Sequence, residues 1–140
     1  MADKYFVDTN ILLYAHDRAA GIKHERARQL IEGLWTGGPG VLSTQVLQEL
    51  CVHLRRKVAR PLAVDEIRRL IHDYMSWEMV VNPPEAVMQA IEIEVRYKTT
   101  FWDALILQAA EKSGAAILYS EDLAAKQSYG TVRVINPLLG

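Results

Sequence analysis

The chain has 140 residues, of which 50% are hydrophobic and 24% charged, and its formal net charge is -1, so we expect a single globular domain over residues 1–140. The near-neutral charge excludes a general attraction to nucleic acid, which would need a local basic patch. The single Cys51 excludes an internal disulfide, and neither a signal peptide nor a membrane-spanning stretch is evident, so we expect a cytoplasmic protein.

An unbroken run of β-forming residues at 5–7 opens the chain. This pattern is typical of a short strand that is buried on both faces. Asp8 comes where the strand should end, and Thr9 or Asn10 is expected to cap a helix over residues 11–16. A carboxylate at this position suits a functional site at the C-terminal edge of a parallel sheet, but it also suits an ordinary turn or cap.

Strands and helices alternate along the rest of the chain, and apolar spacing predicts where each one lies. Further helices are expected over residues 22–35, 65–77, 85–97 and 102–110, and one more is capped by Ser43 or Thr44 and ends in the basic run of Arg55, Arg56 and Lys57. Further strands are expected at residues 41–42, 79–81, 115–119 and 132–135. Such alternation predicts a three-layer α/β/α sandwich around a mostly parallel sheet of about five strands.

Four acids are expected to meet at the C-terminal edge of this sheet. Asp8 and Asp122 follow strands, Asp103 lies in the first turn of an apolar helix, and Glu49 flanks the apolar stripe of the helix before Arg55. Clustered carboxylates repel one another and are costly to bury without a partner. Oxygen ligands of this kind suit Mg²⁺ or Mn²⁺, whereas the four histidines lack the spacing of a zinc site.

Short blocks of sequence surround these acids: FVDTNIL at residues 6–12, STQVLQEL at 43–50, FWDALI at 101–106, SEDL at 120–123 and YGTVRVINP at 129–137. In this order and spacing they resemble the PIN domain family, and most closely the VapC-type toxin ribonucleases of bacterial toxin–antitoxin pairs. The resemblance covers essentially the whole chain. It implies an α/β fold that uses carboxylate-bound metal to hydrolyse RNA.

The resemblance also implies roles for individual residues. It makes four residues the metal-binding and catalytic acids, namely Asp8, Glu49, Asp103 and Asp122. Asn10 and Ser120 match supporting polar positions of the family, although either also suits a local cap or turn. Glu121, next to Asp122, stays open as an alternative ligand. The basic run of Arg55, Arg56 and Lys57 is a candidate RNA contact, although cations also favour the end of a helix without any ligand.

The function that the resemblance implies is a Mg²⁺- or Mn²⁺-dependent endoribonuclease, in which a metal-activated water attacks the RNA phosphodiester. Its partners would be an RNA substrate, a small antitoxin and a second copy of the chain. The second copy would dock through the apolar faces of two helices, the one that ends in the basic run and the one over residues 85–97. Two alternatives stay open: an inactive PIN-like module that binds RNA or protein, and another Mg²⁺-dependent phosphohydrolase. The second usually carries an Asp two residues after the strand-end Asp, where this chain has Asn10.

Overall fold

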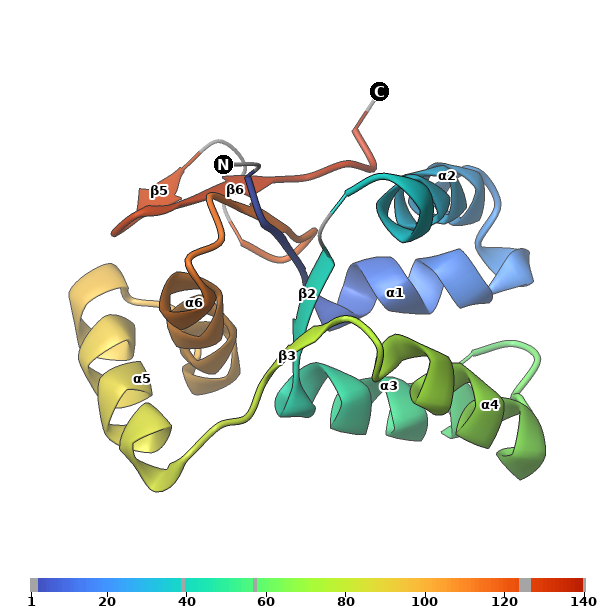
Figure 1. The fold of residues 1–140 in the computed structure, drawn as a ribbon, viewed down its shortest axis with the longest axis horizontal. Helices are drawn as coiled ribbons and strands as arrows, with labels where there is room; N and C mark the ends of the chain where they lie inside the picture. Colours follow the sequence, from blue (N-terminus) through green and yellow to red (C-terminus); the bar gives the residue numbers. More distant parts are fainter. Residues whose placement is uncertain (1–2, 39, 57, 124–126, 140) are drawn as a thin grey trace.

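The computed structural model describes residues 3–38, 40–56, 58–123 and 127–139. In this part of the chain six strands form one sheet in the order β3-β2-β1-β4-β6-β5 (Figure 1). Every neighbouring pair is parallel except β5 with β6. The strands are β1 (Tyr5–Val7), β2 (Gly40–Ser43), β3 (Glu78–Val80), β4 (Ile117–Tyr119), β5 (Ser128–Tyr129) and β6 (Val132–Ile135).

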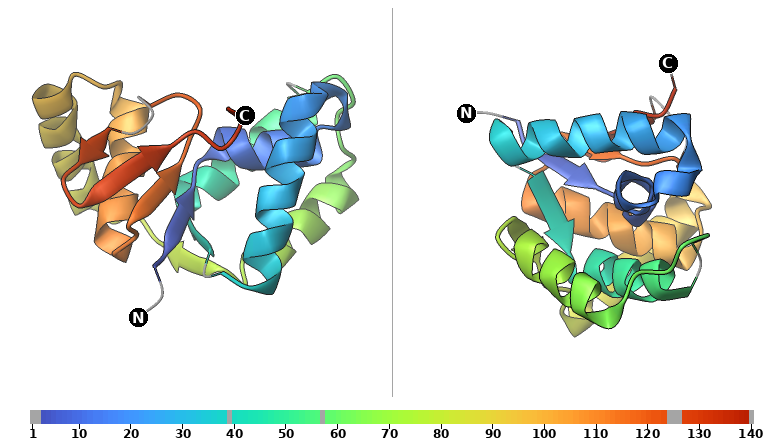
Figure 2. Two further views of the ribbon diagram at one scale, coloured as in Figure 1. Left: turned by 90° about the horizontal axis from the view of Figure 1, so that it is seen from above. Right: turned by 90° about the vertical axis from the view of Figure 1, so that its right-hand side faces the viewer.

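Helices cover both faces of the sheet, which confirms the predicted α/β sandwich. In the views of Figures 1 and 2, α1 to α4 lie on one side of β2, and α5 and α6 lie on the other. None of the described helices has the length and apolar character needed to cross a membrane. The helices are α1 (Thr9–His16), η1 (Arg18–Ala20, a 3-10 turn), α2 (Ile22–Thr36), α3 (Thr44–Arg56), α4 (Val64–Tyr74), α5 (Pro84–Tyr97) and α6 (Phe101–Ser113).

The start of α1 corrects the prediction from sequence. The helix begins at Thr9, two residues earlier than expected, and its N-cap is Asp8 rather than Thr9 or Asn10. Oδ1 of Asp8 accepts a hydrogen bond of 2.7 Å from the backbone N–H of Thr9. Asp8 therefore has the capping role that the sequence left open as well as a place at the edge of the sheet.

Two further differences concern short segments. The sheet has six strands rather than about five, because Ser128 and Tyr129 form β5, antiparallel to β6. A strand of two residues carries no alternation that a sequence could reveal. The helix predicted over residues 65–77 begins at Val64 and ends at Tyr74.

Pairing of β1 with β4 sets the position of the candidate site. Val7 pairs with Tyr119 at the C-terminal ends of the two strands, and the backbone N–H of Asp8 donates to the carbonyl oxygen of Tyr119 at 2.9 Å. Phe6 and Val7 are fully buried, so apolar packing fixes this register. The residues after both strands therefore emerge side by side at one edge.

Candidate metal centre

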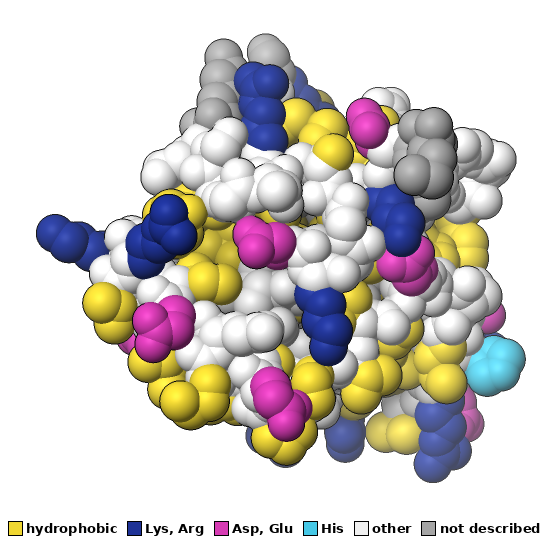
Figure 3. Space-filling model, turned by 60° about the vertical axis from the view of Figure 1, so that its left-hand side comes forward, with side chains coloured by type: hydrophobic (Ala, Val, Ile, Leu, Met, Phe, Trp, Pro, Cys, Tyr) yellow, Lys and Arg dark blue, Asp and Glu magenta, His cyan; other side chains and the backbone are white. Residues whose placement is uncertain are grey.

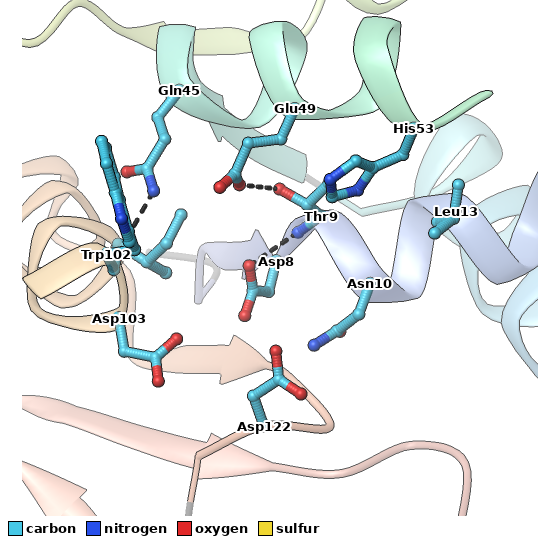
Figure 4. Close-up of a pocket in the computed structure, with 11 residues that line it drawn as sticks. Asp8, Thr9, Asn10, Leu13, Gln45, Glu49, His53, Trp102, Asp103 and Asp122 are labelled. Atoms are coloured by element: carbon cyan, nitrogen blue, oxygen red, sulfur yellow. Dashed lines mark hydrogen bonds between the residues drawn. The ribbon is translucent and has the colours of Figure 1, made fainter. Parts of the chain in front are cut away.

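A cavity of about 280 Å³ lies at this edge of the sheet. Its walls come from the first turns of α1 and α6, from the middle of α3 and from the loop after β4 (Figure 4). All four acids predicted from the sequence line it. The sequence-based expectation that they share one edge therefore agrees with the structure, and their separations distinguish their roles.

Three of the acids lie close enough to share one cation. Asp8, Asp103 and Asp122 each place a carboxylate oxygen within 4.8 Å of the other two. Asp8 is buried, Asp103 is partly buried and Asp122 is exposed. Among the described residues, none of the three forms an ion pair with Lys, Arg or His. Within the described part of the chain, no cationic side chain therefore offsets their mutual repulsion.

The electrostatics of the cluster reflect this repulsion. The pKa of Asp8 is raised to about 7, mainly by burial; hydrogen bonds from Ser120 and Thr9 lower it, and the negative charges of Asp103 and Asp122 add to the rise. The pKa of Asp103 is also raised, first by burial and then by the charges of Asp122 and Glu49. Carboxyl groups in this state release protons when a cation binds.

Ser120 connects two of the three acids. Its hydroxyl donates to Oδ2 of Asp8 at 2.7 Å, and its Oγ accepts a hydrogen bond of 3.2 Å from the backbone N–H of Asp122. Ser120 is fully buried. Its hydroxyl therefore makes a turn contact with the Asp122 backbone and also orients the Asp8 carboxylate.

Glu49 faces the same cavity but is held apart from the group of three. Its Oε1 accepts a hydrogen bond of 2.6 Å from the Thr9 hydroxyl, and Thr9 is 5% exposed (Figure 4). Because Thr9 directly follows Asp8, the start of α1 fixes both carboxylates at once. Glu49 is thus positioned beside the candidate cation site by a residue that sequence reasoning named only as a possible cap.

Asn10 and Glu121 act on the loop after β4. The Asn10 side chain does not cap α1, because its Oδ1 accepts a hydrogen bond of 3.3 Å from the backbone N–H of Glu121. The Glu121 carboxylate accepts from the Tyr14 hydroxyl at 2.7 Å and pairs with Lys23 at 2.6 Å. Glu121 is therefore bound by α1 and α2, while Asp122 joins the acid cluster.

Several residues that line the cavity were missed as site residues. Gln45, Glu49 and His53 recur every four residues, so they form one face of α3 towards the cavity. That spacing is the signal by which Gln45 and His53 were detectable. Arg55 and Arg56 are exposed in the last turn of α3 and do not line the cavity, and Lys57 lies outside the described residues.

Comparison with known families matches residues 5–128 to the PIN domain. The chain belongs to the PIN domain family. The family predicted from the sequence blocks is therefore confirmed, and the match includes every acid of the cavity. Comparison of this PIN domain with curated proteins finds no match.

Solved structures show the same fold in toxin–antitoxin proteins. The PIN domain superposes on Mycobacterium tuberculosis VapC20, a Sarcin-Ricin loop cleaving toxin, with a TM-score of 0.63 and 24% identity over 84% of this chain and 89% of that one. A toxin–antitoxin complex from Klebsiella pneumoniae superposes with a TM-score of 0.68 and 18% identity, over 95% of this chain and 97% of that one. DNA-bound VapBC from Salmonella typhimurium superposes with a TM-score of 0.62 and 18% identity, over 96% of this chain and 97% of that one.

Proposed function

We propose that this PIN domain is a metal-dependent endoribonuclease and acts as the toxin of a toxin–antitoxin pair. The observation that carries the proposal is the group of Asp8, Asp103 and Asp122, whose carboxylate oxygens lie within 4.8 Å of one another at the sheet edge. Membership of the PIN family supports phosphodiester hydrolysis as the reaction. The likeness to solved toxins supports RNA as the substrate and a small antitoxin as the partner.

The residues present suit a hard divalent cation. Among the described residues, the cavity lining offers carboxylates, amides, one hydroxyl and the imidazole of His53, and it includes neither Lys nor Arg to neutralise the acids. Oxygen donors of this kind favour Mg²⁺ or Mn²⁺ over softer metals. Asp8, Asp103 and Asp122 would hold the cation. When bound, it would lower the pKa of a water molecule and offset the charge of the attacked phosphate.

The chain itself supplies orientation. Ser120 and the backbone N–H of Thr9 each donate to one oxygen of Asp8, which fixes the plane of its carboxylate. Thr9 holds Glu49 through Oε1 at the wall of the cavity, where the Glu49 carboxylate would accept a proton from the attacking water. Catalysis on this account rests on positioning and charge, since no nucleophilic side chain is required.

The antitoxin and a second copy of the chain would use other surfaces. The prediction that the apolar face of α3 forms a dimer interface is wrong, because Val46, Leu50 and Leu54 are fully buried in the core. The outer face of α5 remains a candidate, since four of its apolar residues are exposed. These are Val87, Met88, Ile91 and Val95. On the side shown in Figure 3, hydrophobic side chains are interspersed with both signs of charge, which suits contact with a second copy of the chain.

The test is cleavage of total cellular RNA by the purified protein with Mg²⁺ or Mn²⁺. The matched variants are Asp8→Asn in the cluster and Asp65→Asn, which alters an exposed acid at the start of α4. We expect discrete products from the wild type and Asp65→Asn, and none from Asp8→Asn or in EDTA. Cleavage by Asp8→Asn, or cleavage that EDTA leaves unchanged, would overturn the proposal. A folded protein that neither cuts RNA nor gains thermal stability from Mn²⁺ would favour the inactive binding module.

A further inference from the structure

Trp102 is a large apolar side chain that the fold leaves exposed at the candidate site. It directly precedes Asp103 in the first turn of α6 and lines the same cavity, yet 62% of its surface is exposed. A tryptophan buries 150–250 Å² when packed, so leaving one in water forgoes a large hydrophobic gain. The exposed ring beside the acids is therefore available to a ligand with a flat apolar face.

The backbone of Trp102 is held in place by a buried side chain. Nε2 of Gln45 donates a hydrogen bond of 3.2 Å to the carbonyl oxygen of Trp102, and Gln45 is 4% exposed. Only the NH₂ group can donate to a carbonyl, so this bond fixes the orientation of the amide. The Oε1 atom of Gln45 is then a buried acceptor without a partner among the described residues. Leaving this buried acceptor without a hydrogen bond is energetically unfavourable at this wall of the cavity.

The indole ring is also restrained along one side. Phe101 meets it edge to face, with ring centroids 5.3 Å apart and planes at 80°. A ring that is anchored through its backbone and supported by a neighbour loses little conformational freedom when a ligand stacks on it. Trp102 is therefore a preorganised aromatic surface rather than a loose exposed side chain.

The position of Trp102 gives the cavity two different ends. In Figure 4 Trp102 and Gln45 lie at one end, Leu13 and His53 lie at the other, and the acids lie between them. Phosphates are repelled by the acids until a cation is bound, and the chain has no net positive charge to offset this. An interaction that does not depend on charge, such as base stacking, would therefore help RNA to bind beside the cluster.

We infer that Trp102 is the stacking platform for an unpaired nucleobase of the RNA strand whose phosphate lies at the acids. The inference rests on the proposed ribonuclease function and names its substrate class as single-stranded or looped RNA. Aromatic side chains stack on any base through its π face, whereas a base inside a continuous duplex is already stacked on its neighbours. Gln45 acts through Trp102 as a positioning residue.

Binding, rather than cleavage, is the direct test. The Asp8→Asn protein serves as the non-cutting background, and the probes are 5′-labelled oligo(A) and oligo(U) strands and a blunt RNA duplex of the same length, followed by fluorescence anisotropy. The variants are Trp102→Ala and Trp102→Phe, with Met75→Ala as a control at another exposed apolar residue, directly after α4. Mn²⁺ affinity of each Trp102 variant in the wild-type background, by calorimetry, reports whether Asp103 has moved.

Trp102→Ala should weaken binding of the single strands by between about 5-fold and about 150-fold, which corresponds to the loss of one stacked base. Trp102→Phe should recover most of this loss, Met75→Ala should have no effect, and duplex binding should be weak and insensitive to all three. The Mn²⁺ affinity should stay unchanged.

Single-strand binding that is equal in Trp102→Ala and the parent would overturn the inference and would favour a protein partner for the ring. Equal losses for strand and duplex, or a parallel loss of Mn²⁺ affinity, would overturn it as well. The outcome is separable from that of the proposed function. If cleavage depends on Asp8 but single-strand binding does not depend on Trp102, only the stacking inference is overturned. If binding depends on Trp102 but the wild type does not cleave RNA, only the proposed nuclease function is overturned.

Discussion

Ser120 and Asp8 are 112 residues apart in the chain, and the Ser120 hydroxyl donates to Oδ2 of Asp8 at 2.7 Å. The contact follows from the pairing of β1 with β4, which places the residues after Val7 and Tyr119 next to each other. It links Asp8, the buried carboxylate of the cluster, to the loop that carries Asp122. The geometry of the candidate metal centre therefore depends on a neutral hydroxyl as well as on its acids.

Replacing Ser120 with alanine should lower Mn²⁺ affinity and RNA cleavage by about 10- to 100-fold, the range typical of groups that orient metal ligands. Both the donor to Asp8 and the acceptor for the Asp122 N–H are lost. Calorimetry with Mn²⁺ and a cleavage time course measure the two effects. Ser76→Ala, which alters an exposed serine at the end of α4, should match the wild type. Unchanged metal affinity in Ser120→Ala would show that the hydroxyl is dispensable.

Thr9→Val should distinguish the role of Glu49 from that of the metal-binding acids. Valine has nearly the shape of threonine but cannot donate to Oε1 of Glu49, so that carboxylate loses its 2.6 Å hydrogen bond. We expect kcat for RNA cleavage to fall about tenfold while Mn²⁺ affinity changes little. Thr9→Ser retains the hydroxyl and should recover most of the rate. Loss of metal binding in Thr9→Val would instead place Glu49 among the direct ligands.

The neighbouring acids Glu121 and Asp122 should behave differently. Asp122→Asn removes a carboxylate from the cluster, so it should reduce cleavage by at least about 100-fold. Glu121→Gln breaks an ion pair with Lys23 that is partly exposed, and should change stability by less than about 1 kcal/mol. Its cleavage rate should stay within about threefold of the wild type. A larger loss in Glu121→Gln than in Asp122→Asn would reverse the assignment.

The raised pKa of Asp8 predicts how pH affects the metal-free protein. Burial raises this pKa from 3.8 to about 7 in the folded chain. The folded state therefore holds the proton more tightly, and its stabilising effect is complete below pH 3.8 and is lost as the pH rises through 7.

Asp8→Asn removes this dependence, so in EDTA at pH 8 it should be more stable than the wild type, by an amount on the order of 2–4 kcal/mol. The difference in stability between the two proteins should be much smaller at pH 5. Thermal unfolding at both pH values measures it, and Mg²⁺ should raise the Tm of the wild type only. A gap that is equal at pH 5 and pH 8 would contradict the raised pKa.

Local sequence patterns were sufficient to predict the acids of the cluster. Asp8 could be found because it follows an apolar run, and Asp103 because it opens an unusually apolar helix. An apolar run also precedes Asp122, but only the resemblance to the PIN family favoured it over Glu121. The strand-to-helix alternation then placed them at one edge. These patterns involve residues that are adjacent in the chain, so they can be recognised without knowledge of the packing.

The contacts that hold these acids are not local, and the sequence did not reveal them. Thr9 lies 40 residues from Glu49, and Gln45 lies 57 residues from Trp102. Whether such residues meet depends on how α1, α3 and α6 pack, which no periodicity specifies. Glu121 shows the same limit, since its contacts with Tyr14 and Lys23 on α1 and α2 decide that Asp122 is the acid facing the cavity.

The most direct measurement is Mn²⁺ binding by isothermal titration calorimetry at pH 8, with wild type, Asp103→Asn and the exposed control Asp65→Asn. If Asp8, Asp103 and Asp122 hold the cation, the wild type and Asp65→Asn should bind Mn²⁺ alike, and Asp103→Asn should bind it at least about tenfold more weakly. Equal binding by Asp103→Asn and the wild type, or no binding by any of the three folded proteins, would contradict the assignment of these carboxylates as a metal centre.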